Sequence, residues 1–359
     1  MSFSEVIFNP VAQVKFVHTV SAGYVTGAMF VLAISAYYML KKRDLPFARR
    51  SFAIASSFGL ASILSVIVLG DESGYEIGEV QKVKLAAIEA EWETHEPPAA
   101  FTLFGIPDQE NMETDYAIKI PYALGLIATR SVTEEVKGLK DLIAEHEIKI
   151  RNGIVAYDLL TQIKAGDRSE ATIAEFRSRV DDLGYGLLLK KYVENPVNAT
   201  EEQIKLAAQN SIPRVAPMFW TFRIMVGLGF IMLVLIGLSF YYSAKGTAER
   251  QKYLLRALII ALPAPWIACE MGWFVAEFGR QPWSIGGILP THLSVSTRSV
   301  EDIYMSLAGF IGFYTLLLIA EMYLMIRFAR LGPSSLHTGR YHWEQTGEND
   351  SASTSPAQA

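Results

Sequence analysis

The sequence predicts an all-α fold, a polytopic bundle of five membrane-spanning helices with a long, largely helical domain outside the membrane. Hydrophobic residues make up 51% of the 359 residues and charged residues 19%. This composition is too apolar for a typical soluble enzyme and too charged for a chain that lies wholly in lipid. The apolar residues also gather in segments of the roughly 20 residues that a bilayer requires. These segments are residues 14–40, 52–70, 217–243, 254–278 and 304–328.

Lysine and arginine residues gather beside three of these spans. They are Lys41, Lys42, Arg43, Arg49 and Arg50 after the first span, Lys245, Arg250, Lys252 and Arg256 after the third, and Arg327 and Arg330 at the end of the fifth. Because basic loops stay on the cytoplasmic side, we expect these loops and the C-terminus to be cytoplasmic. The long segment between the second and third spans is then on the outer, periplasmic-type face of the membrane.

Composition shifts divide the chain into four parts. We expect the first two membrane helices in residues 1–70, the outer domain in 71–214, three further membrane helices in 215–330, and a partly disordered cytoplasmic tail in 331–359. The outer domain opens on GDESGYEIGEV, which we interpret as a turn that leads into a polar helix. Later stretches show apolar residues at helical spacing, and no strand pattern competes with them.

Charge and cysteine content exclude several classes of protein. The net charge of −5 and the lack of zinc-finger, Walker and Rossmann patterns argue against nucleic-acid binding. The single cysteine excludes an internal disulfide framework. Five histidines lack metal-ligand spacing and are expected at the surface or in the tail. They are His95, His146, His292, His337 and His342.

Four polar or aromatic residues near the end of the fourth span share one helical stripe. Glu270, Trp273, Glu277 and Arg280 are separated by three, four and three residues, which places them on one face of a helix. An unpaired carboxylate near the centre of a membrane helix costs on the order of 2.5 to 3.5 kcal/mol. We therefore expect the stripe to face a partner, a cavity or a cofactor.

His18 and Met225 lie a few residues inside the outer ends of the first and third spans. The histidine could be a metal or haem ligand, or could be satisfied by a neighbouring helix, and position alone favours neither. A methionine at this depth is more often a packing residue. Histidine and methionine are nevertheless an axial pair for low-spin haem, and Arg223 is near enough in sequence to pair with a haem propionate.

Four motifs carry a resemblance to a known family: KFVHTV near the start, GDESGYE and KLAAIEAEWE in the outer domain, and GRQPW after a membrane glutamate. From about Ser2 to Tyr341, the chain resembles subunit I of a cytochrome bd quinol oxidase of the long Q-loop type. The Q-loop is the quinol-oxidising loop of this family, and it corresponds here to residues 71–214.

The resemblance implies a role for each matching residue. His18 and Met225 match the axial ligands of a low-spin haem b, with Arg223 beside that haem. Glu277 matches a ligand of a high-spin haem, Trp273 an aromatic residue between haems, and Arg280 an arginine near the propionates. Lys84 and Glu89 match residues of the quinol-oxidising loop. The implied cofactors are haem b and haem d, and the implied substrate is ubiquinol or menaquinol.

Spacing allows two interpretations of Lys84 and Glu89. Five residues on a helix place them about 140° apart, so they would not form an i,i+4 ion pair. They could flank a quinol, with the carboxylate accepting a proton from one hydroxyl and the lysine bonding the opposite oxygen. Alternatively, they belong to a solvated helical face, as charges on loop helices usually do.

The resemblance also implies partners: subunit II, a small accessory subunit, and membrane lipid. The family's subunit begins with four helices that have no counterpart here, so we expect this chain alone to be inactive and to depend on those missing helices for its oxygen-reducing centre. Two alternatives from other classes stay open. One is an ion- or proton-translocating transporter subunit, and the other is a non-catalytic fragment.

Overall fold

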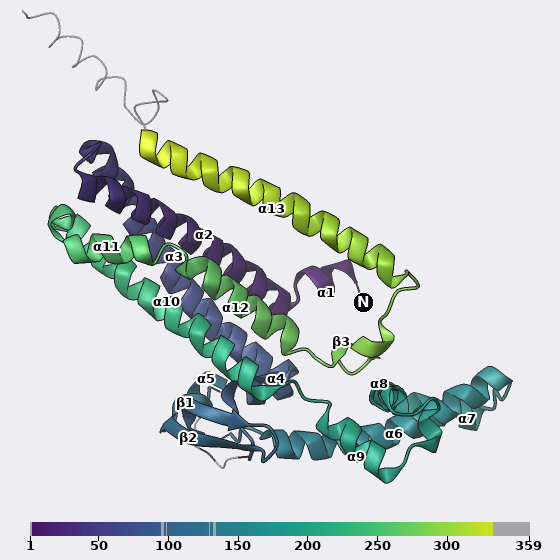
Figure 1. The fold of residues 1–359 in the computed structure, drawn as a ribbon. Helices are drawn as coiled ribbons and strands as arrows, with labels where there is room; N and C mark the ends of the chain where they lie inside the picture. Colours follow the sequence, from purple (N-terminus) through teal and green to yellow (C-terminus); the bar gives the residue numbers. More distant parts are fainter. Residues whose placement is uncertain (1, 95–96, 98, 129, 132–133, 333–359) are drawn as a thin grey trace, which may run out of the picture. The chain divides into compact units, whose positions relative to one another are not determined.

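The computed structural model describes residues 2–94, 97, 99–128, 130–131 and 134–332, and it is mostly helical (Figure 1). Contacts divide the chain into two compact units. The first contains residues 1–22, 64–231 and 264–295, and the second contains residues 23–63, 232–263 and 296–359. The predicted tail from residue 333 onward lies outside the described residues, as do His95, His337 and His342.

Among the described residues, four of the five predicted spans are confirmed as single helices, and the fifth corresponds to a bent pair of helices. Four helices are each long and apolar enough to cross a membrane: α2 (Pro10–Lys41), α3 (Leu45–Val80), α10 (Val215–Ala244) and α13 (Val300–Leu331). The fifth span is a pair, α11 (Lys252–Ile260) and α12 (Ala264–Phe278), which is bent by 42° at a short break. Pro263 lies in that break and Pro265 follows it, and proline interrupts a helix because it lacks the backbone N–H.

The second unit is held together by close helix packing. Phe52, Leu32 and Ile236 are fully buried in it. A Cβ atom built at Gly59 of α3 would lie only 2.9 Å from the Cβ of Ala28 on α2 and 3.4 Å from Ile236 on α10. The lack of a side chain at Gly59 therefore lets three membrane helices approach one another.

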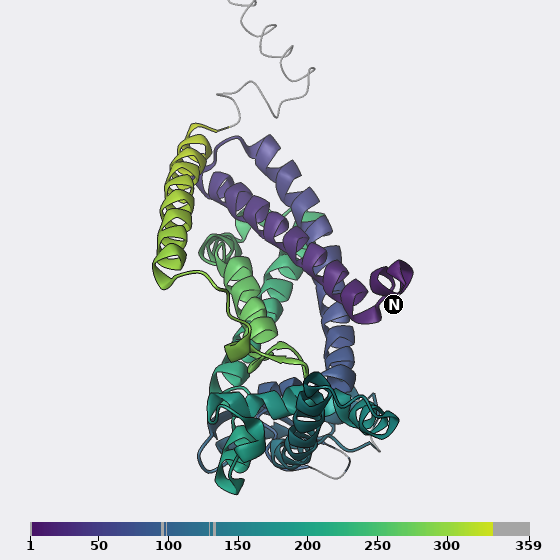
Figure 2. The same cartoon turned by 90° about the vertical axis from the view of Figure 1, so that its right-hand side faces the viewer.

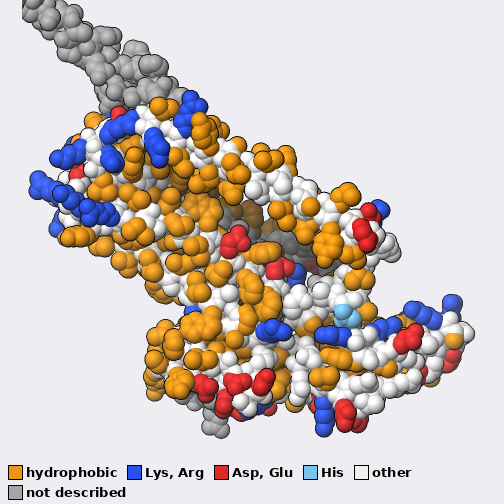
Figure 3. Space-filling model, viewed as in Figure 1, with side chains coloured by type: hydrophobic (Ala, Val, Ile, Leu, Met, Phe, Trp, Pro, Cys, Tyr) orange, Lys and Arg blue, Asp and Glu red, His pale blue; other side chains and the backbone are white. Residues whose placement is uncertain are grey.

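One end of the second unit carries its basic residues. The Tyr38 hydroxyl donates to the Ala329 carbonyl (2.9 Å), the Arg43 guanidinium donates to the carbonyls of Arg330 and Leu331, and Arg49 pairs with Glu249. Figure 3 shows lysine and arginine side chains gathered at this end, whereas apolar side chains cover the helices. The loops predicted to be cytoplasmic thus meet the end of α13.

The predicted helical outer domain lies in the first unit, between α3 and α10. Its helices are α4 (Lys82–Glu89), α5 (Ala123–Ala128), α6 (Leu139–Ala165), α7 (Glu170–Arg179), α8 (Leu183–Leu187) and α9 (Glu201–Gln209), with short 3-10 turns η1 (Val180–Asp182), η2 (Leu188–Lys191) and η3 (Pro196–Asn198). The same unit contains the N-terminal helix α1 (Phe3–Ile7). The turn predicted at GDESGYE is wrong, because α3 continues as one helix through this polar sequence to Val80.

Glycines set the packing of the central helix of this domain. The long helix α6 lies side by side with α8 and α9 (Figures 1 and 2). A Cβ atom at Gly153 of α6 would lie 2.4 Å from the Asp182 carbonyl oxygen, and one at Gly186 of α8 would lie 2.4 Å from the Gly153 backbone. The two backbones are therefore in direct contact at these positions.

Two hairpins were not predicted. Strands β1 (Phe101–Asp108) and β2 (Glu113–Ile120) pair antiparallel, with register shifts after Thr102 and after Phe104. These irregularities break the two-residue alternation that identifies a strand in a sequence. A second, very short hairpin follows α12 and consists of β3 (Trp283–Ile285) and β4 (Leu289–Pro290), with η5 (Thr291–Leu293) after it.

Candidate functional site

Helix α4 places Lys84 and Glu89 inside the protein. Its sequence KVKLAAIE is rich in helix-forming residues, and Leu85, Ala87 and Ile88 pack in a hydrophobic cluster. Lys84 is only 4% exposed and Glu89 only 3%. Lysine and glutamate are almost never buried without partners, so the interpretation of a solvated helical face is wrong.

Arg223 of α10 is the partner of Glu89. One terminal nitrogen of its guanidinium lies 3.1 Å from Oε2 of Glu89, and the other donates to the Ile88 carbonyl (2.6 Å). The same guanidinium donates to the carbonyls of Thr102 and Leu103 in β1. One side chain thus joins α10 to α4 and to the first hairpin. These bonds occupy the guanidinium of Arg223. Its predicted role beside a haem propionate would require the propionate to replace some of these bonds, and that role stays a prediction.

Burial dominates the proton affinity of Glu89. Removing the carboxylate from water raises its pKa to about 7, although the adjacent Arg223 charge and hydrogen bond act in the opposite direction. A carboxyl group with a pKa near 7 can both accept and release a proton at neutral pH. Glu89 therefore has the properties of a general base.

Lys84 points to the end of α12. Its Nζ donates to the Ala276 carbonyl (3.1 Å) in the last turn of that helix, where backbone carbonyls lack helical partners. A Cβ atom at Gly279 would lie 3.0 Å from Cε of Lys84, so the glycine makes room for this approach. Burial, followed by the charges of Lys15 and Arg280, lowers the pKa of Lys84 to about 8, while Glu277 opposes this change.

The predicted stripe on α12 is largely uncovered. Glu277 pairs with Arg280, and both side chains are 45% exposed. Trp273 is 65% exposed, and Glu270 is exposed as well. The described part of the chain therefore leaves this face of α12 partly exposed, and the expectation that it faces a cofactor stays a prediction.

His18 lies on α2 against the outer part of α3. Its ring is beside the Val66 carbonyl and 3.5 Å from the position of a Cβ atom at Gly70. Its Nδ1 atom is buried and has no hydrogen-bond partner. A buried polar atom without a partner is costly, and a metal ion is one means of satisfying it.

Met225 lies on α10 against α12. Its sulfur is only 2.9 Å from the position that a Cβ atom would take at Gly272, so this methionine fills the space above the glycine. His18 and Met225 therefore have different helical neighbours, and the structure shows no direct contact that joins them. Among the described residues, no group of three or more histidine, cysteine, aspartate or glutamate side chains could hold a metal ion. His18 and Met225 each carry a donor atom of a type that haem iron accepts, and a haem needs only one or two axial ligands.

Comparison with known proteins identifies the family. The family model for cytochrome bd terminal oxidase subunit I matches residues 1–333. This chain belongs to that family. It is 47% identical over 337 residues to the cytochrome bd-II ubiquinol oxidase subunit 1 of Escherichia coli, covering 94% of this chain and 66% of that relative.

Two further similarities agree with the cytochrome bd subunit I assignment. The cytochrome bd ubiquinol oxidase subunit 1 of Bacillus subtilis is 30% identical, with 92% of this chain and 59% of that relative covered. The solved bd oxidase from Geobacillus thermodenitrificans is 25% identical with a TM-score of 0.64, and 92% of this chain and 60% of that chain are covered. The chain thus spans less than two thirds of the length of these relatives.

Family membership and the apolar helices together make this chain a multi-pass protein of the inner membrane. The comparisons give no support to the transporter alternative. The matched region contains all eight residues proposed for the site, and the structure places all eight in the first unit.

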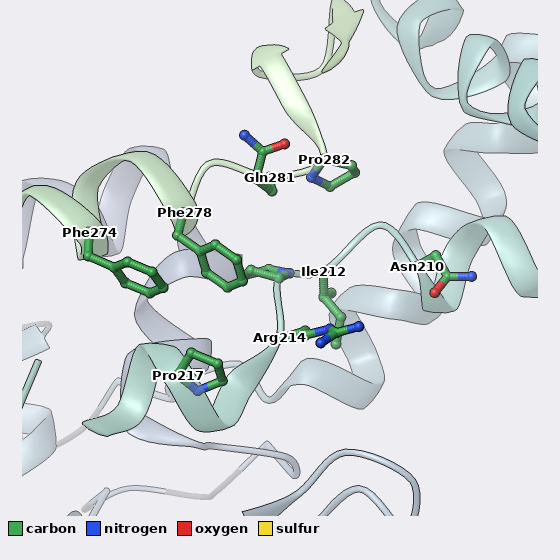
Figure 4. A pocket seen from close by; sticks show the side chains of 9 residues that line it. Asn210, Ile212, Arg214, Pro217, Phe274, Phe278, Gln281 and Pro282 are labelled. Atoms are coloured by element: carbon green, nitrogen blue, oxygen red, sulfur yellow. The ribbon is translucent and has the colours of Figure 1, made fainter. Parts of the chain in front are cut away.

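A pocket of about 380 Å³ lies where α10 begins and α12 ends (Figure 4). Phe274 and Phe278 stack along one wall, with ring centroids 4.7 Å apart, and Pro217 faces them from α10. Arg214 and Gln281 add polar groups to the lining. The pocket adjoins the turn of α12 that receives Lys84, and its apolar wall is suited to a flat ring or an acyl chain.

Sequence reasoning missed two buried titratable residues of the outer domain. His146, expected at the surface, is 6% exposed, and its Nδ1 lies 2.6 Å from the Ser211 hydroxyl. Glu91 is 2% exposed. The spacing of apolar residues in α6 could have revealed His146, which shares a helical face with Leu142 and Ile150. No comparable signal marks Glu91, which lies after the end of α4.

Proposed function

We propose that this chain forms the quinol-oxidising and electron-entry part of a cytochrome bd oxidase. It would oxidise quinol at the periplasmic face and pass electrons through a low-spin haem b to a high-spin pair of haems, b and d, where the complete enzyme reduces oxygen to water. One observation carries the proposal. The buried residues Lys84 and Glu89 of α4 are tied, respectively, to α12 and α10, the two helices that carry Glu277 and Met225.

The substrate class follows from the relatives. The Escherichia coli relative is named as a ubiquinol oxidase subunit, and a more distant Bacillus subtilis relative, 25% identical, as a putative menaquinol oxidase subunit. A quinol of either type has two hydroxyl groups on opposite sides of a flat ring. Glu89 would take the proton of one hydroxyl, and Lys84 would donate a hydrogen bond to the opposite oxygen.

Arg223 supports this chemistry by position. Its charge restrains the rise in the pKa of Glu89 that burial causes, and its bonds to Thr102 and Ile88 hold the hairpin and α4 against α10. Arg223 thereby keeps the pKa of Glu89 near 7 and fixes the position of its carboxylate.

The same helices would hold the haems. His18 and Met225 are the proposed axial ligands of the low-spin haem b, and the buried Nδ1 of His18 without a partner is the observation that supports a ligand there. Glu277, with Trp273 and Arg280 beside it, would face a high-spin haem from the uncovered side of α12. When bound, the haem iron would supply a one-electron acceptor for quinol oxidation.

The orientation of the chain in the membrane decides on which side the quinol protons are released. We place the Q-loop domain on the periplasmic side and the C-terminus in the cytoplasm, because the basic loops lie at one end of the second unit. Protons from quinol would then be released outside the membrane. If the complete enzyme takes the protons for oxygen reduction from the cytoplasm, charge is separated without a pump.

Several partners belong to this proposal. The enzyme would contain subunit II and a small accessory subunit, and lipid would surround its apolar helices. The exposed parts of α12 and the largely exposed helix α13 offer contact surfaces for additional helices. We infer that the remaining part of a full-length subunit I completes the high-spin haem pocket and that this chain is inactive without it.

Replacement of Glu89 by glutamine tests the proposal in the oxidase that carries this chain. Quinol oxidation should fall by about 100-fold, a typical contribution of a general base, and the haem content should not change. In the unmodified enzyme the rate should rise as the pH increases through about 7, since only the ionised carboxylate accepts a proton. This dependence should disappear in Glu89→Gln.

Glu93 provides the matched control, because it lies only four residues after Glu89. It is an exposed glutamate that pairs with Lys140. Glu93→Gln should oxidise quinol at the normal rate. Normal turnover in Glu89→Gln would contradict the proposed function.

A further inference from the structure

A second carboxylate is buried two residues after Glu89. Glu91 is 2% exposed, which is as little as Glu89. The residue between them, Ala90, ends α4 in the left-handed conformation, with φ 52° and ψ 41°. Left-handed residues are usual at helix ends, although glycine or asparagine commonly occupies the position. The chain therefore turns between the two glutamates, and both side chains stay inside the protein.

Three elements fix the position of Glu91. Its backbone N–H donates to the Ala86 carbonyl of α4 (2.9 Å), and its carbonyl accepts from the Leu139 N–H at the start of α6 (2.9 Å). The next residue, Trp92, donates from its indole to the Thr114 hydroxyl of β2 (2.9 Å). The backbone that carries the carboxylate is thus held by α4 and α6, and the neighbouring Trp92 ties it to the first hairpin.

Two charged residues, one exposed and one buried, act on Glu91. Burial raises the pKa of Glu91 to about 7, and the positive charge of Lys119 on β2 acts against this rise. Lys119 itself is exposed. On the other side, Glu91 and Glu89 are close enough that the negative charge of Glu91 raises the pKa of Glu89, while Arg223 lowers it. The buried carboxylate of Glu91 therefore interacts electrostatically with buried Glu89 and with exposed Lys119.

The stoichiometry of quinol oxidation requires more than Glu89. Each quinol loses two protons and two electrons, and a single carboxylate can hold only one proton. Lys84 is the other titratable residue assigned to the site, and in its ammonium form it has no capacity to accept a proton. A second buried carboxylate with an outlet to solvent meets this need.

We propose that Glu91 is a proton-relay residue for quinol oxidation and carries protons from Glu89 to the solvent beside Lys119. This inference rests on the proposed function. Both O–H bonds of the quinol break, and the product is the quinone. The two protons pass through the two carboxylates to water, and the haem that His18 and Met225 would hold would supply the one-electron oxidant for the two electrons. Glu91 does not touch the substrate and acts through Glu89.

The test compares Glu91→Gln with Glu91→Asp and with Glu93→Gln in the intact oxidase. The measured quantity is the rate of low-spin haem reduction by quinol, and separately by tetramethyl-p-phenylenediamine, an electron donor that releases no proton. Glu91→Gln should slow reduction by quinol about tenfold, which is less than the 100-fold or more expected for a group that takes the proton directly from the substrate, and should increase the solvent deuterium isotope effect of this step. Reduction by the proton-free donor should be unchanged. Glu91→Asp should recover much of the quinol rate, and Glu93→Gln should behave as the unmodified enzyme.

Other results would overturn the relay. Equal slowing with both donors in Glu91→Gln, without recovery in Glu91→Asp, would show that Glu91 only supports the fold. A normal quinol rate in Glu91→Gln beside a low rate in Glu89→Gln would reject the relay and leave the proposed function in place. A normal rate in Glu89→Gln would instead reject the proposed function itself.

Discussion

Arg223 and Glu89 are buried as a pair, with 9% and 4% of their side chains exposed. Moving two charges out of water is costly, and their attraction compensates only when both are present. Truncation of one partner leaves the other charge buried alone. For this reason the pair contributes more to the arrangement of α4 and α10 than to the net stability of the protein.

Replacement of Arg223 by methionine should therefore destabilise the outer domain by about 3 to 5 kcal/mol, the usual cost of an unpaired buried charge. The double variant Arg223→Met/Glu89→Leu should regain a large part of this loss, yet should not oxidise quinol. Thermal unfolding of the four members of the cycle measures the coupling. Additive effects of the two substitutions would contradict the pairing.

His146 makes the outer domain sensitive to acid. Burial lowers its pKa to about 4, from an ordinary value of 6.5. The unfolded state therefore binds more protons than the folded state between pH 6.5 and 4, and stability falls as the pH drops through this window. The total change is about 3 kcal/mol, at about 1.4 kcal/mol for each pH unit between the two values.

The variant His146→Asn removes the titrating group but keeps a donor near the Ser211 hydroxyl. Its stability should show a smaller decrease from pH 6.5 to 4 than that of the unmodified protein. Urea unfolding of the outer domain at a series of pH values measures the difference. Parallel curves for the two proteins would contradict a neutral, buried His146.

Residue roles were predictable from the sequence only in part. Motif similarity selected Lys84 and Glu89, whereas the charge pattern alone favoured a solvated helix. The charge pattern failed because the burial of α4 depends on residues more than 100 positions away, such as Arg223 and Ala276. His146 was misjudged for the same reason. Its burial depends on Ser211 and Tyr185, which approach α6 only in the folded chain.

At the scale of elements, the apolar spans were predictable because their length and composition are set by the bilayer. The bend between α11 and α12 coincides with Pro263 and Pro265. The polar end of α3 was not predicted as helix, because its charged residues were interpreted as a turn. The β1–β2 hairpin was missed because its irregular register hides the alternation of a strand.

Glycine contacts between α6 and α8 provide a test at this scale. Alanine at Gly153 would place a Cβ atom 2.4 Å from backbone atoms of Asp182 and Gly186, so the two helices must separate. We expect a loss of about 2 kcal/mol or more, in the range of overpacked cores. Gly286, with nothing within 4 Å of a Cβ atom, is the matched control. Gly153→Ala should be cleaved faster than Gly286→Ala in limited proteolysis of the outer domain, and equal rates would contradict the close approach.

At the scale of the whole molecule, the chain divides into two compact units. The first unit contains every residue proposed for quinol oxidation and haem ligation, from His18 to Arg280. The second contains the basic loops and α13. The chain covers 66% of its Escherichia coli relative, so oxygen reduction is a property that we assign to the complete enzyme and not to this chain alone.

The central claim is that quinol electrons enter at α4 and pass to a low-spin haem held by His18 and Met225. The most direct test is the reduced-minus-oxidised spectrum of the oxidase that carries this chain, recorded after reduction by quinol. The low-spin haem signal should disappear in His18→Ala and change in Met225→Leu, and it should be unaffected in Met305→Leu, where the methionine is 76% exposed on α13. A low-spin signal that persists unchanged in both His18→Ala and Met225→Leu would contradict the account.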